Sequence, residues 1–138
     1  MVEYEVERAR RLVLARVFAL PTVAAAQAYS AACAAEIGSA VGGRPILLAD
    51  HRAVRLYPPD VTDALCAVFR INNALIERIA ILVSPSNATL HMQLQRITRE
   101  AGGDVRRVFT RAAEATEFLE PSLSPSERGE VATFFDAQ

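Results

Sequence analysis

Four short apolar runs alternate with segments of helical periodicity, and this alternation constrains the fold more than any other feature of the chain. The runs are residues 11–18, 44–49, 78–83 and 105–109. The third is apolar on both faces, which is typical of a central strand covered by helices on both sides. Strands separated by helices pair in parallel through right-handed crossovers. The pattern therefore predicts a single α/β domain with helices packed against a sheet.

The chain opens with a strict alternation of apolar and acidic residues, Val2-Glu3-Tyr4-Glu5-Val6-Glu7. This predicts a half-buried antiparallel strand over residues 2–7, at an edge of the sheet and in a hairpin with residues 11–18. Arg8-Ala9-Arg10 is the expected break between the two strands. The full predicted order is ββαβαβαβα, in a mixed sheet. Arg16, inside the second strand, needs a carboxylate partner if buried, which one of the three glutamates could supply.

The helical segments have recognisable start and stop signals. They are expected at about residues 22–41, 61–76, 88–101 and 111–119. Glycine pairs end the first and the third, at residues 42–43 and 102–103. Asp60 or Thr62 is the expected cap of the second helix, and Thr110 is that of the fourth.

Residues 1–120 form the predicted domain, and residues 121–138 form a tail. In the tail, Ser124-Pro125-Ser126-Glu127 has the spacing of a capping box and predicts a short helix to about Phe135. The apolar side chains of that helix need a covering surface. We expect them to cover the chain's own sheet, with packing on a second copy, in a homodimer, as the alternative.

Charge and length exclude several classes of protein. The 138 residues carry a net charge of -1, without the basic surplus with which nucleic-acid binders collect phosphates. No apolar run approaches the ~20 residues of a membrane span, and the first residues lack the basic start and apolar stretch of a signal peptide. Cys33 and Cys66 fit small core residues in a reducing compartment, so a cytoplasmic protein is expected.

All 15 basic residues are arginine, because the sequence contains no lysine. This excludes Schiff-base catalysis and the lysine-dependent phosphate loop. The two cysteines and the two histidines, His51 and His91, show no metal-ligand spacing. Neither a metal site nor a cofactor is therefore expected.

In open α/β sheets, ligands gather where the parallel strands end. Three loops meet there in the predicted fold, at residues 50–60, 84–87 and 110–111. Arg52, Arg55 and Arg111 are expected to converge on the N-termini of the helices that follow, where free amides and the helix dipole favour an anion. A phosphate, a nucleotide or a lipid headgroup would suit such a place, and solvated surface arginines are the alternative.

An enzyme would need His51 as a base oriented by Asp50, with Ser84 or Ser86 as nucleophile. Adjacent residues at a strand end point to opposite sides, so Asp50 is badly placed to orient His51. Neither serine lies in a nucleophile-elbow motif. We therefore expect no catalytic residues, with Asp50 binding loop amides and with Ser84, Ser86 and Asn87 capping the next helix.

Several segments together resemble the STAS fold of bacterial anti-sigma-factor antagonists, the SpoIIAA-like proteins. They are the opening hairpin, the strand Leu47-Leu48-Ala49-Asp50, the stretch from Glu77 to Val83, and Arg107-Val108-Phe109-Thr110 with the helix after it. The chain looks most like the divergent branch related to lipid-transfer-type domains. The resemblance implies regulation by protein–protein contact.

In sporulation-type antagonists, a partner kinase phosphorylates a serine at the start of the second helix, which changes the partner that is bound. The corresponding segment here, Leu56-Tyr57-Pro58-Pro59-Asp60-Val61-Thr62, has no serine. Thr62 is the nearest hydroxyl, and we interpret it as a helix cap or first-turn residue. The resemblance therefore implies a binding module without the phosphorylation switch.

Two functions are expected. The first is a non-enzymatic, STAS-like regulatory or scaffolding domain that contacts a protein through Arg55, Tyr57, Pro58 and Pro59 beside the second helix. The alternative is a domain that binds a small molecule, an anion or a lipid in an apolar pocket between sheet and helices, with arginines at the rim. The candidate binding residues are Arg52, Arg55, Tyr57, Thr62, Ser84, Ser86 and Arg111.

Overall fold

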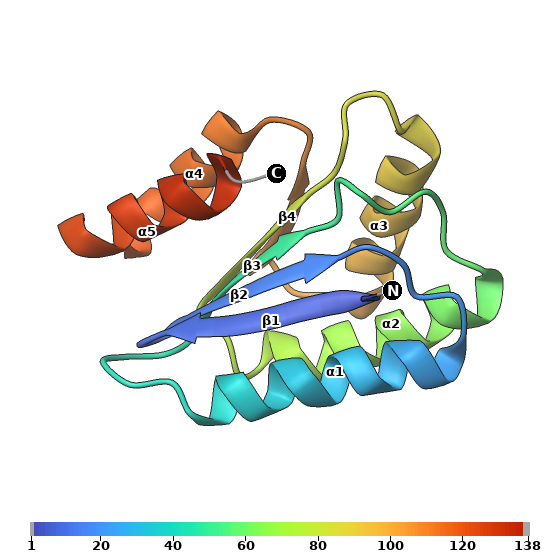
Figure 1. Cartoon of the computed structure of the whole chain (residues 1–138), viewed down its shortest axis with the longest axis horizontal. Coiled ribbons are helices and arrows are strands. Elements are labelled where there is room, and N and C mark those ends of the chain that lie inside the picture. The colour runs from blue at the N-terminus through green and yellow to red at the C-terminus, as the bar shows by residue number, and fades with distance from the viewer. Residues whose placement is uncertain (1, 137–138) are drawn as a thin grey trace.

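The computed structural model describes residues 2–136, which form a five-stranded sheet with helices on both faces (Figure 1). The strands are β1 (Tyr4–Ala9), β2 (Leu12–Val17), β3 (Ile46–Asp50), β4 (Arg78–Leu82) and β5 (Arg106–Phe109). The helices are α1 (Val23–Gly38), α2 (Pro59–Asn73), α3 (Ala88–Ala101), α4 (Ala112–Leu119), the short 3-10 helix η1 (Glu120–Ser122) and α5 (Pro125–Asp136). The predicted α/β fold and its element order are confirmed. Within these residues, no helix combines the length and apolar character that crossing a membrane requires.

The strands lie side by side in the order in which they follow one another in the chain. β1 pairs antiparallel with β2, and every later pair is parallel. The expected break between the hairpin strands is wrong, because Arg8 and Ala9 continue β1 and pair with Val13 and Leu12. Pairing satisfies their backbone groups and leaves a two-residue turn, in which Arg10 adopts a φ of 56°.

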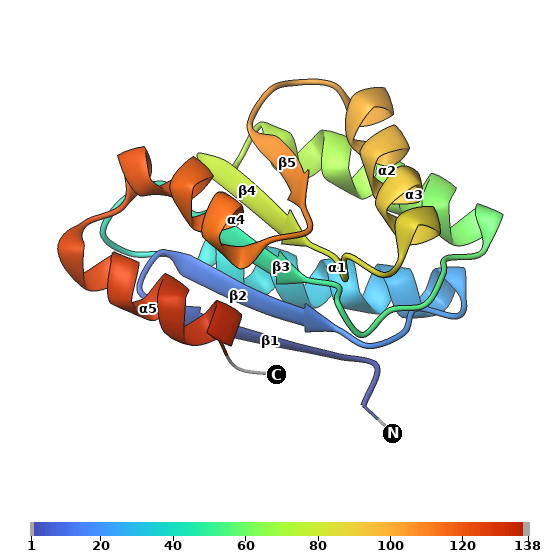
Figure 2. The same ribbon diagram turned by 90° about the horizontal axis from the view of Figure 1, so that it is seen from above.

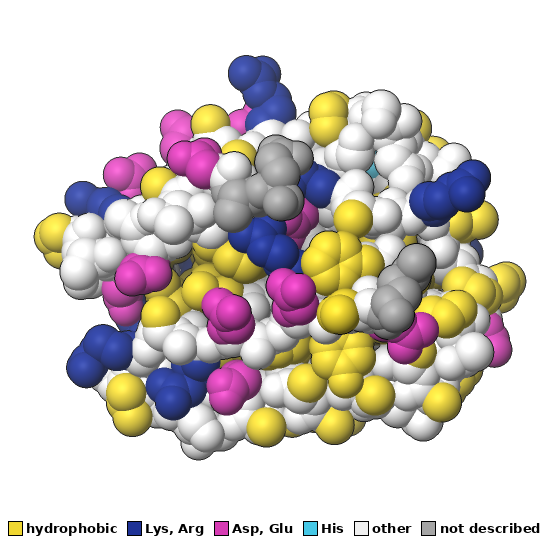
Figure 3. Space-filling view, viewed as in Figure 1, with side chains coloured by type: hydrophobic (Ala, Val, Ile, Leu, Met, Phe, Trp, Pro, Cys, Tyr) yellow, Lys and Arg dark blue, Asp and Glu magenta, His cyan; other side chains and the backbone are white. Residues whose placement is uncertain are grey.

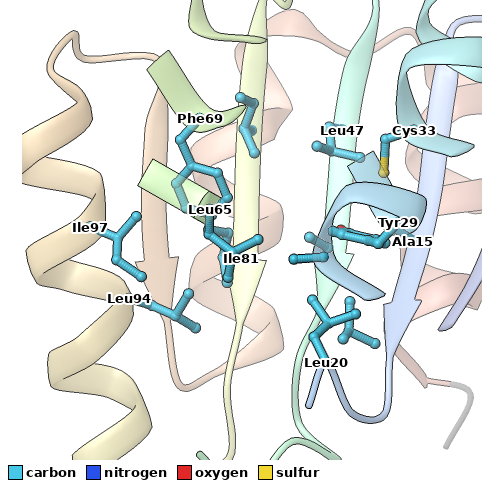
Figure 4. Packing of buried hydrophobic residues seen from close by; sticks show 14 of the residues in the cluster. Ala15, Leu20, Tyr29, Cys33, Leu47, Leu65, Phe69, Ile81, Leu94 and Ile97 are labelled. Atoms are coloured by element: carbon cyan, nitrogen blue, oxygen red, sulfur yellow. The ribbon is translucent and has the colours of Figure 1, made fainter. Parts of the chain in front are cut away.

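Side chains alternate between the two faces of the sheet, and each face has its own apolar cluster. One face meets α1, α2 and α3, and Figure 4 shows part of this packing, with Leu47 and Ile81 of the sheet among Tyr29, Cys33, Leu65, Phe69, Leu94 and Ile97 of the helices. The opposite face, which includes Leu12, Leu48 and Leu82, is covered by α4 and α5 (Figure 2). Every residue of β3 is buried, as a strand between two helical layers requires.

Two of the predicted helix caps are wrong. α2 begins at Pro59 after Pro58 and has no side-chain cap, because Pro58 at the N-cap carries no side-chain acceptor; Pro59 suits the first helical position because its missing N–H is not needed there. Thr62 lies in the first turn, buried, and its hydroxyl donates to the carbonyl of Pro59 at 2.7 Å. α4 likewise follows Arg111 without a side-chain cap, so Thr110 does not fill that role.

The C-terminal helix α5 is docked on the sheet, as predicted. Its capping box is formed: Ser124 N donates to Glu127 Oε1 at 2.8 Å, and Glu127 N donates to Ser124 Oγ at 3.3 Å. Arg11, in the hairpin turn, binds the carboxylate of Glu127. Its Nε donates to Oε2 at 2.7 Å, and its Nη2 donates to Oε1 at 2.9 Å. These Arg11 hydrogen bonds lower the pKa of Glu127 to about 2. Val131, Phe134 and Phe135 are buried against the sheet.

We expect the substitution Phe135→Ala to destabilise the whole domain. The Phe135 side chain is 2% exposed in the cluster beneath α4 and α5, so its loss leaves a cavity that costs about 3 kcal/mol of unfolding free energy or more. Met92→Ala, at a side chain 69% exposed, should change it by less than about 0.5 kcal/mol. Urea denaturation would measure both, and equal effects would contradict the docking of α5.

Candidate functional site

The carboxyl ends of β2, β3 and β4 carry several of the polar contacts that join separate parts of the chain. The long connection after β3 runs from His51 to Pro58 and contains no helix or strand. Backbone groups in such a segment need partners other than a regular ladder. We call residues 51–58 the anchored loop, because three side chains hold it in place. His51 belongs to the loop itself, and Asn87 and Gln93 lie outside it.

Three buried or half-buried side chains hold the anchored loop in place. Nδ1 of His51 lies 2.7 Å from the hydroxyl of Tyr57, which joins the two ends of the loop. Asn87, the N-cap of α3, donates from Nδ2 to the carbonyls of Val54 at 3.1 Å and Arg55 at 2.8 Å. Gln93 of α3 accepts from Tyr57 N at 3.1 Å and donates to Tyr57 O at 2.9 Å. An irregular segment is thus held in one conformation.

The contact surface predicted from Arg55, Tyr57, Pro58 and Pro59 is wrong in its aromatic member. Tyr57 is 1% exposed and points into the core beside His51, with ring centroids 6.0 Å apart. Burial of so large a ring stabilises the fold, and the Tyr57 hydroxyl has the imidazole of His51 as its hydrogen-bond partner. Leu56 takes its place at the surface with 55% of its side chain exposed, and Arg55 is exposed as well.

The arrangement around His51 does not resemble a catalytic dyad. Burial lowers the pKa of His51 to about 4, although the charge of Asp50 acts in the opposite direction. Burial likewise raises the pKa of Tyr57 far above its ordinary value. Ser84 and Ser86 lie with their hydroxyls 2.8 Å apart, and no hydrogen bond joins either to His51 among the described residues. The imidazole is therefore a neutral, buried anchor of the loop.

Asp50 at the end of β3 binds two arginines. Its Oδ2 lies 2.6 Å from Arg16 Nη1 and 2.9 Å from Arg52 Nη2, and its Oδ1 accepts from Arg52 N and Nε at 3.0 Å each. Burial alone would raise the pKa of Asp50, but the hydrogen bonds and charges of Arg52 and the charge of Arg16 hold it below the usual value. Glu5 of β1 lies opposite Arg16 in the antiparallel register, but the ion pair of Arg16 is formed with Asp50, its neighbour in the parallel register, so the partner expected among the β1 glutamates is wrong.

The same two arginines also hold the end of α5. Arg16 Nη2 donates to the carbonyl of Phe134 at 2.5 Å, and Arg52 Nη2 donates to that of Phe135 at 2.8 Å. The guanidinium of Arg16 lies 4.1 Å from the centre of the Phe134 ring. Cations at the last carbonyls of a helix complement its dipole. Arg52 thus contributes to the packing of α5.

The other two arginines predicted to bind an anion, Arg55 and Arg111, are not part of this cluster. Arg55 and Arg111 are exposed, and no hydrogen bond or ion pair of the described residues connects them with Arg52. Their convergence on an anion stays a prediction. No group of three or more His, Cys, Asp or Glu side chains in residues 2–136 is placed to hold a metal ion.

The hollows beside Arg16 and Asp50 are small. One of about 160 Å³ lies among Arg16, Asp50, Arg52, Val17, Phe18 and Ala53, and another of about 210 Å³ lies on the other side of Arg16, toward Phe134. The cavity between the sheet and helices α1 and α2, beside Cys33 and Arg106, measures about 10 Å³, the room of roughly one water molecule. The space expected there for a ligand is therefore filled by side chains.

Comparison of the chain with protein-family models, with curated proteins and with solved structures found no match. The geometry of residues 2–136 is therefore the basis for any functional conclusion.

The burial of His51 should make stability depend on pH. Its pKa is about 4 in the folded chain and about 6.5 in the unfolded chain, so the unfolded chain binds more protons between these values. Stability is then complete above pH 6.5 and falls with pH through this window, by about 2 to 3 kcal/mol at pH 4.5.

Urea denaturation from about pH 7 to pH 4.5 would measure this loss. The variant His51→Gln keeps a polar group at the position but cannot titrate, so its unfolding free energy should vary much less over the same range. Asp50 and Glu127 have lowered pKa values, so most of the stability that they contribute is lost below pH 4.5. A wild-type stability that stays flat across the window would contradict the buried neutral imidazole.

Proposed function

We propose that the chain is a non-enzymatic, STAS-like interaction domain of a bacterial cytoplasm, with a regulatory or scaffolding role, that presents the anchored loop to a protein partner. The observation that carries this proposal is the fixation of residues 51–58 by His51, Asn87 and Gln93. A loop held in one conformation loses little entropy when a partner binds it. Binding residues are often found on loops that a rigid scaffold positions in this way.

The surface around the loop has the composition of a contact site. Arg55 and Leu56 are exposed on the loop, and Met92, which is 69% exposed, precedes Gln93 at the point where α3 holds Tyr57. A shallow groove of about 550 Å³ continues along α3, past Met92 and Arg96. Methionine and arginine are enriched where proteins bind each other.

The order and arrangement of the elements also support the proposal. The observed ββαβαβαβα order is the one on which the resemblance to anti-sigma-factor antagonists rests. The resemblance implies a domain that works through protein contacts. Because the hydroxyl of Thr62 is buried and bound to Pro59 O, the proposal includes no phosphorylation at that position.

We expect the double variant Arg55→Ala/Leu56→Ala to remain folded and to lose partner capture by about tenfold or more. Both side chains are exposed, so their truncation should leave the unfolding midpoint nearly unchanged. The measurement is capture from an extract of the source bacterium by the immobilised domain, quantified by mass spectrometry.

The matched control is Arg44→Ala/Leu75→Ala, which removes an exposed arginine and a leucine that is 51% exposed at the opposite end of the parallel strands. It should capture the same partner as the wild type. Equal capture by the wild type and both variants would contradict the proposal that the anchored loop is the contact surface.

The alternative function, binding of a small molecule, an anion or a lipid, is favoured by one observation. The hollow of about 160 Å³ beside Arg16, Asp50 and Arg52 combines guanidinium groups with the apolar Val17 and Phe18. It is smaller than the usual 300–1,000 Å³ of a ligand pocket, so it suits a small ion better than a lipid chain. Native mass spectrometry of the purified chain would show a retained ligand, and repeated spectra of the bare protein would contradict this alternative.

A further inference from the structure

Both edges of the sheet are open, and its two edge strands carry opposite charge. β1 and β5 are the outer strands of the order β1-β2-β3-β4-β5, and Figure 2 shows them on opposite sides of the molecule. Within residues 2–136, no strand lies beyond either of them. An open edge presents unpaired backbone groups that another strand can bind.

The edge formed by β1 is acidic. Glu5 and Glu7 are exposed, and neither forms an ion pair within the described part of the chain. Figure 3 shows acidic side chains along the line of β1. Glu7 lies opposite Leu14 in the register, on the face of the sheet that α5 covers.

The edge formed by β5 is basic. Its Val105 and Phe109 carbonyls accept from Ile79 N and Val83 N toward β4, so the alternating backbone groups of Arg106 and Val108 point away from the sheet. Arg107 is exposed and lies opposite Ala80, on the face covered by α4. A hollow of about 240 Å³ follows this edge under α3, and none of the residues that line it is acidic: Gln95, Thr98, Arg99, Arg106, Arg107 and Val108.

We propose that copies of this chain associate head to tail, with β1 of one copy adding to β5 of the next. Pairing of two β1 edges would bring glutamates together, and pairing of two β5 edges would bring arginines together, which disfavours both. Only the unlike edges attract. Glu5 and Glu7 of one copy lie on the same face as Arg107 of the next, because each belongs to the face that α4 and α5 cover.

The strand directions fit the same arrangement. β1 is antiparallel to the other four strands, so an antiparallel pairing with β5 leaves all parallel strands of both copies pointing the same way. The contact joins two different surfaces, so a pair of copies still has one free edge of each kind and the contact can repeat. This surface is separate from the anchored loop, and the inference does not rest on the proposed function.

A single pair of edge strands buries little area, so the association should be weak and sensitive to salt. Sedimentation velocity and light scattering at low salt are expected to show an average mass that rises with protein concentration and does not stop at a dimer. Added salt should lower that mass. A plateau at the dimer would overturn the head-to-tail arrangement, and a monomer at every concentration would overturn the association.

Charge reversal tests which edges meet. Glu7→Arg replaces one of the two exposed acidic side chains of the β1 edge by a basic one, and Arg107→Glu makes the exposed charge of the β5 edge acidic. Each variant alone should associate about tenfold more weakly than the wild type. An equal mixture of the two should associate again, because the basic side chain introduced at position 7 of one variant can then face the acidic side chain introduced at position 107 of the other. The double variant Glu7→Arg/Arg107→Glu should also recover.

Asp63→Arg is the matched control, because it makes the same change of charge at an exposed position of α2. It should associate like the wild type. If the single reversals leave association unchanged, or if the mixture of the two fails to restore it while each variant stays folded, the pairing of β1 with β5 is wrong.

Discussion

Burial of β3 and β4 on both faces is the constraint on which the rest of the structure depends. All residues of β3, and all of β4 after Arg78, are buried. Right-handed crossovers between successive parallel strands place α1, α2 and α3 on the same face. The opposite face, with Leu48 and Leu82, would lie in water without a second cover. The helices α4 and α5 supply it, so the C-terminal helix is part of the core.

Arginines attach that second cover to the sheet. Arg11 binds Glu127 near the start of α5, while Arg16 and Arg52 bind the carbonyls of Phe134 and Phe135 at its end. The carboxylate of Asp50 pairs with both of the last two arginines and offsets part of their charge. Guanidinium groups suit this role because they donate several hydrogen bonds in fixed directions and remain charged when partly buried. The attachment of α5 to the sheet therefore accounts for the charged cluster at the carboxyl end of β3 without a ligand.

The fold could be predicted from the sequence because periodicity reports on burial in regular elements. The alternation in residues 2–7, the apolar run 78–83 and the capping box at Ser124 each correspond to an observed element. Loops have no such period, so nothing near Tyr57 indicated that its ring points inward and that Leu56 points outward.

Pairings between distant residues were equally hidden. Arg16 and Asp50 are neighbours only because β2 and β3 lie in parallel register, and Gln93 reaches Tyr57 only because α3 follows the loop in space. Asn87 could be predicted as a helix cap, whereas its second role, binding the carbonyls of the anchored loop, needs the tertiary structure. The candidate site was therefore located at the correct end of the sheet but with some of the wrong side chains.

The position of α5 in the chain has a consequence for synthesis on the ribosome. The face of the sheet made by Leu12, Leu48 and Leu82 forms from segments that emerge early, yet its cover includes Phe134 and Phe135, which are translated more than eighty residues after Leu48. During that interval a nascent chain exposes an apolar strand surface of the kind that leads to misassembly. Completion of this domain thus waits for its last helix, and a polypeptide stalled or truncated before that helix would be a natural substrate for chaperones and proteases.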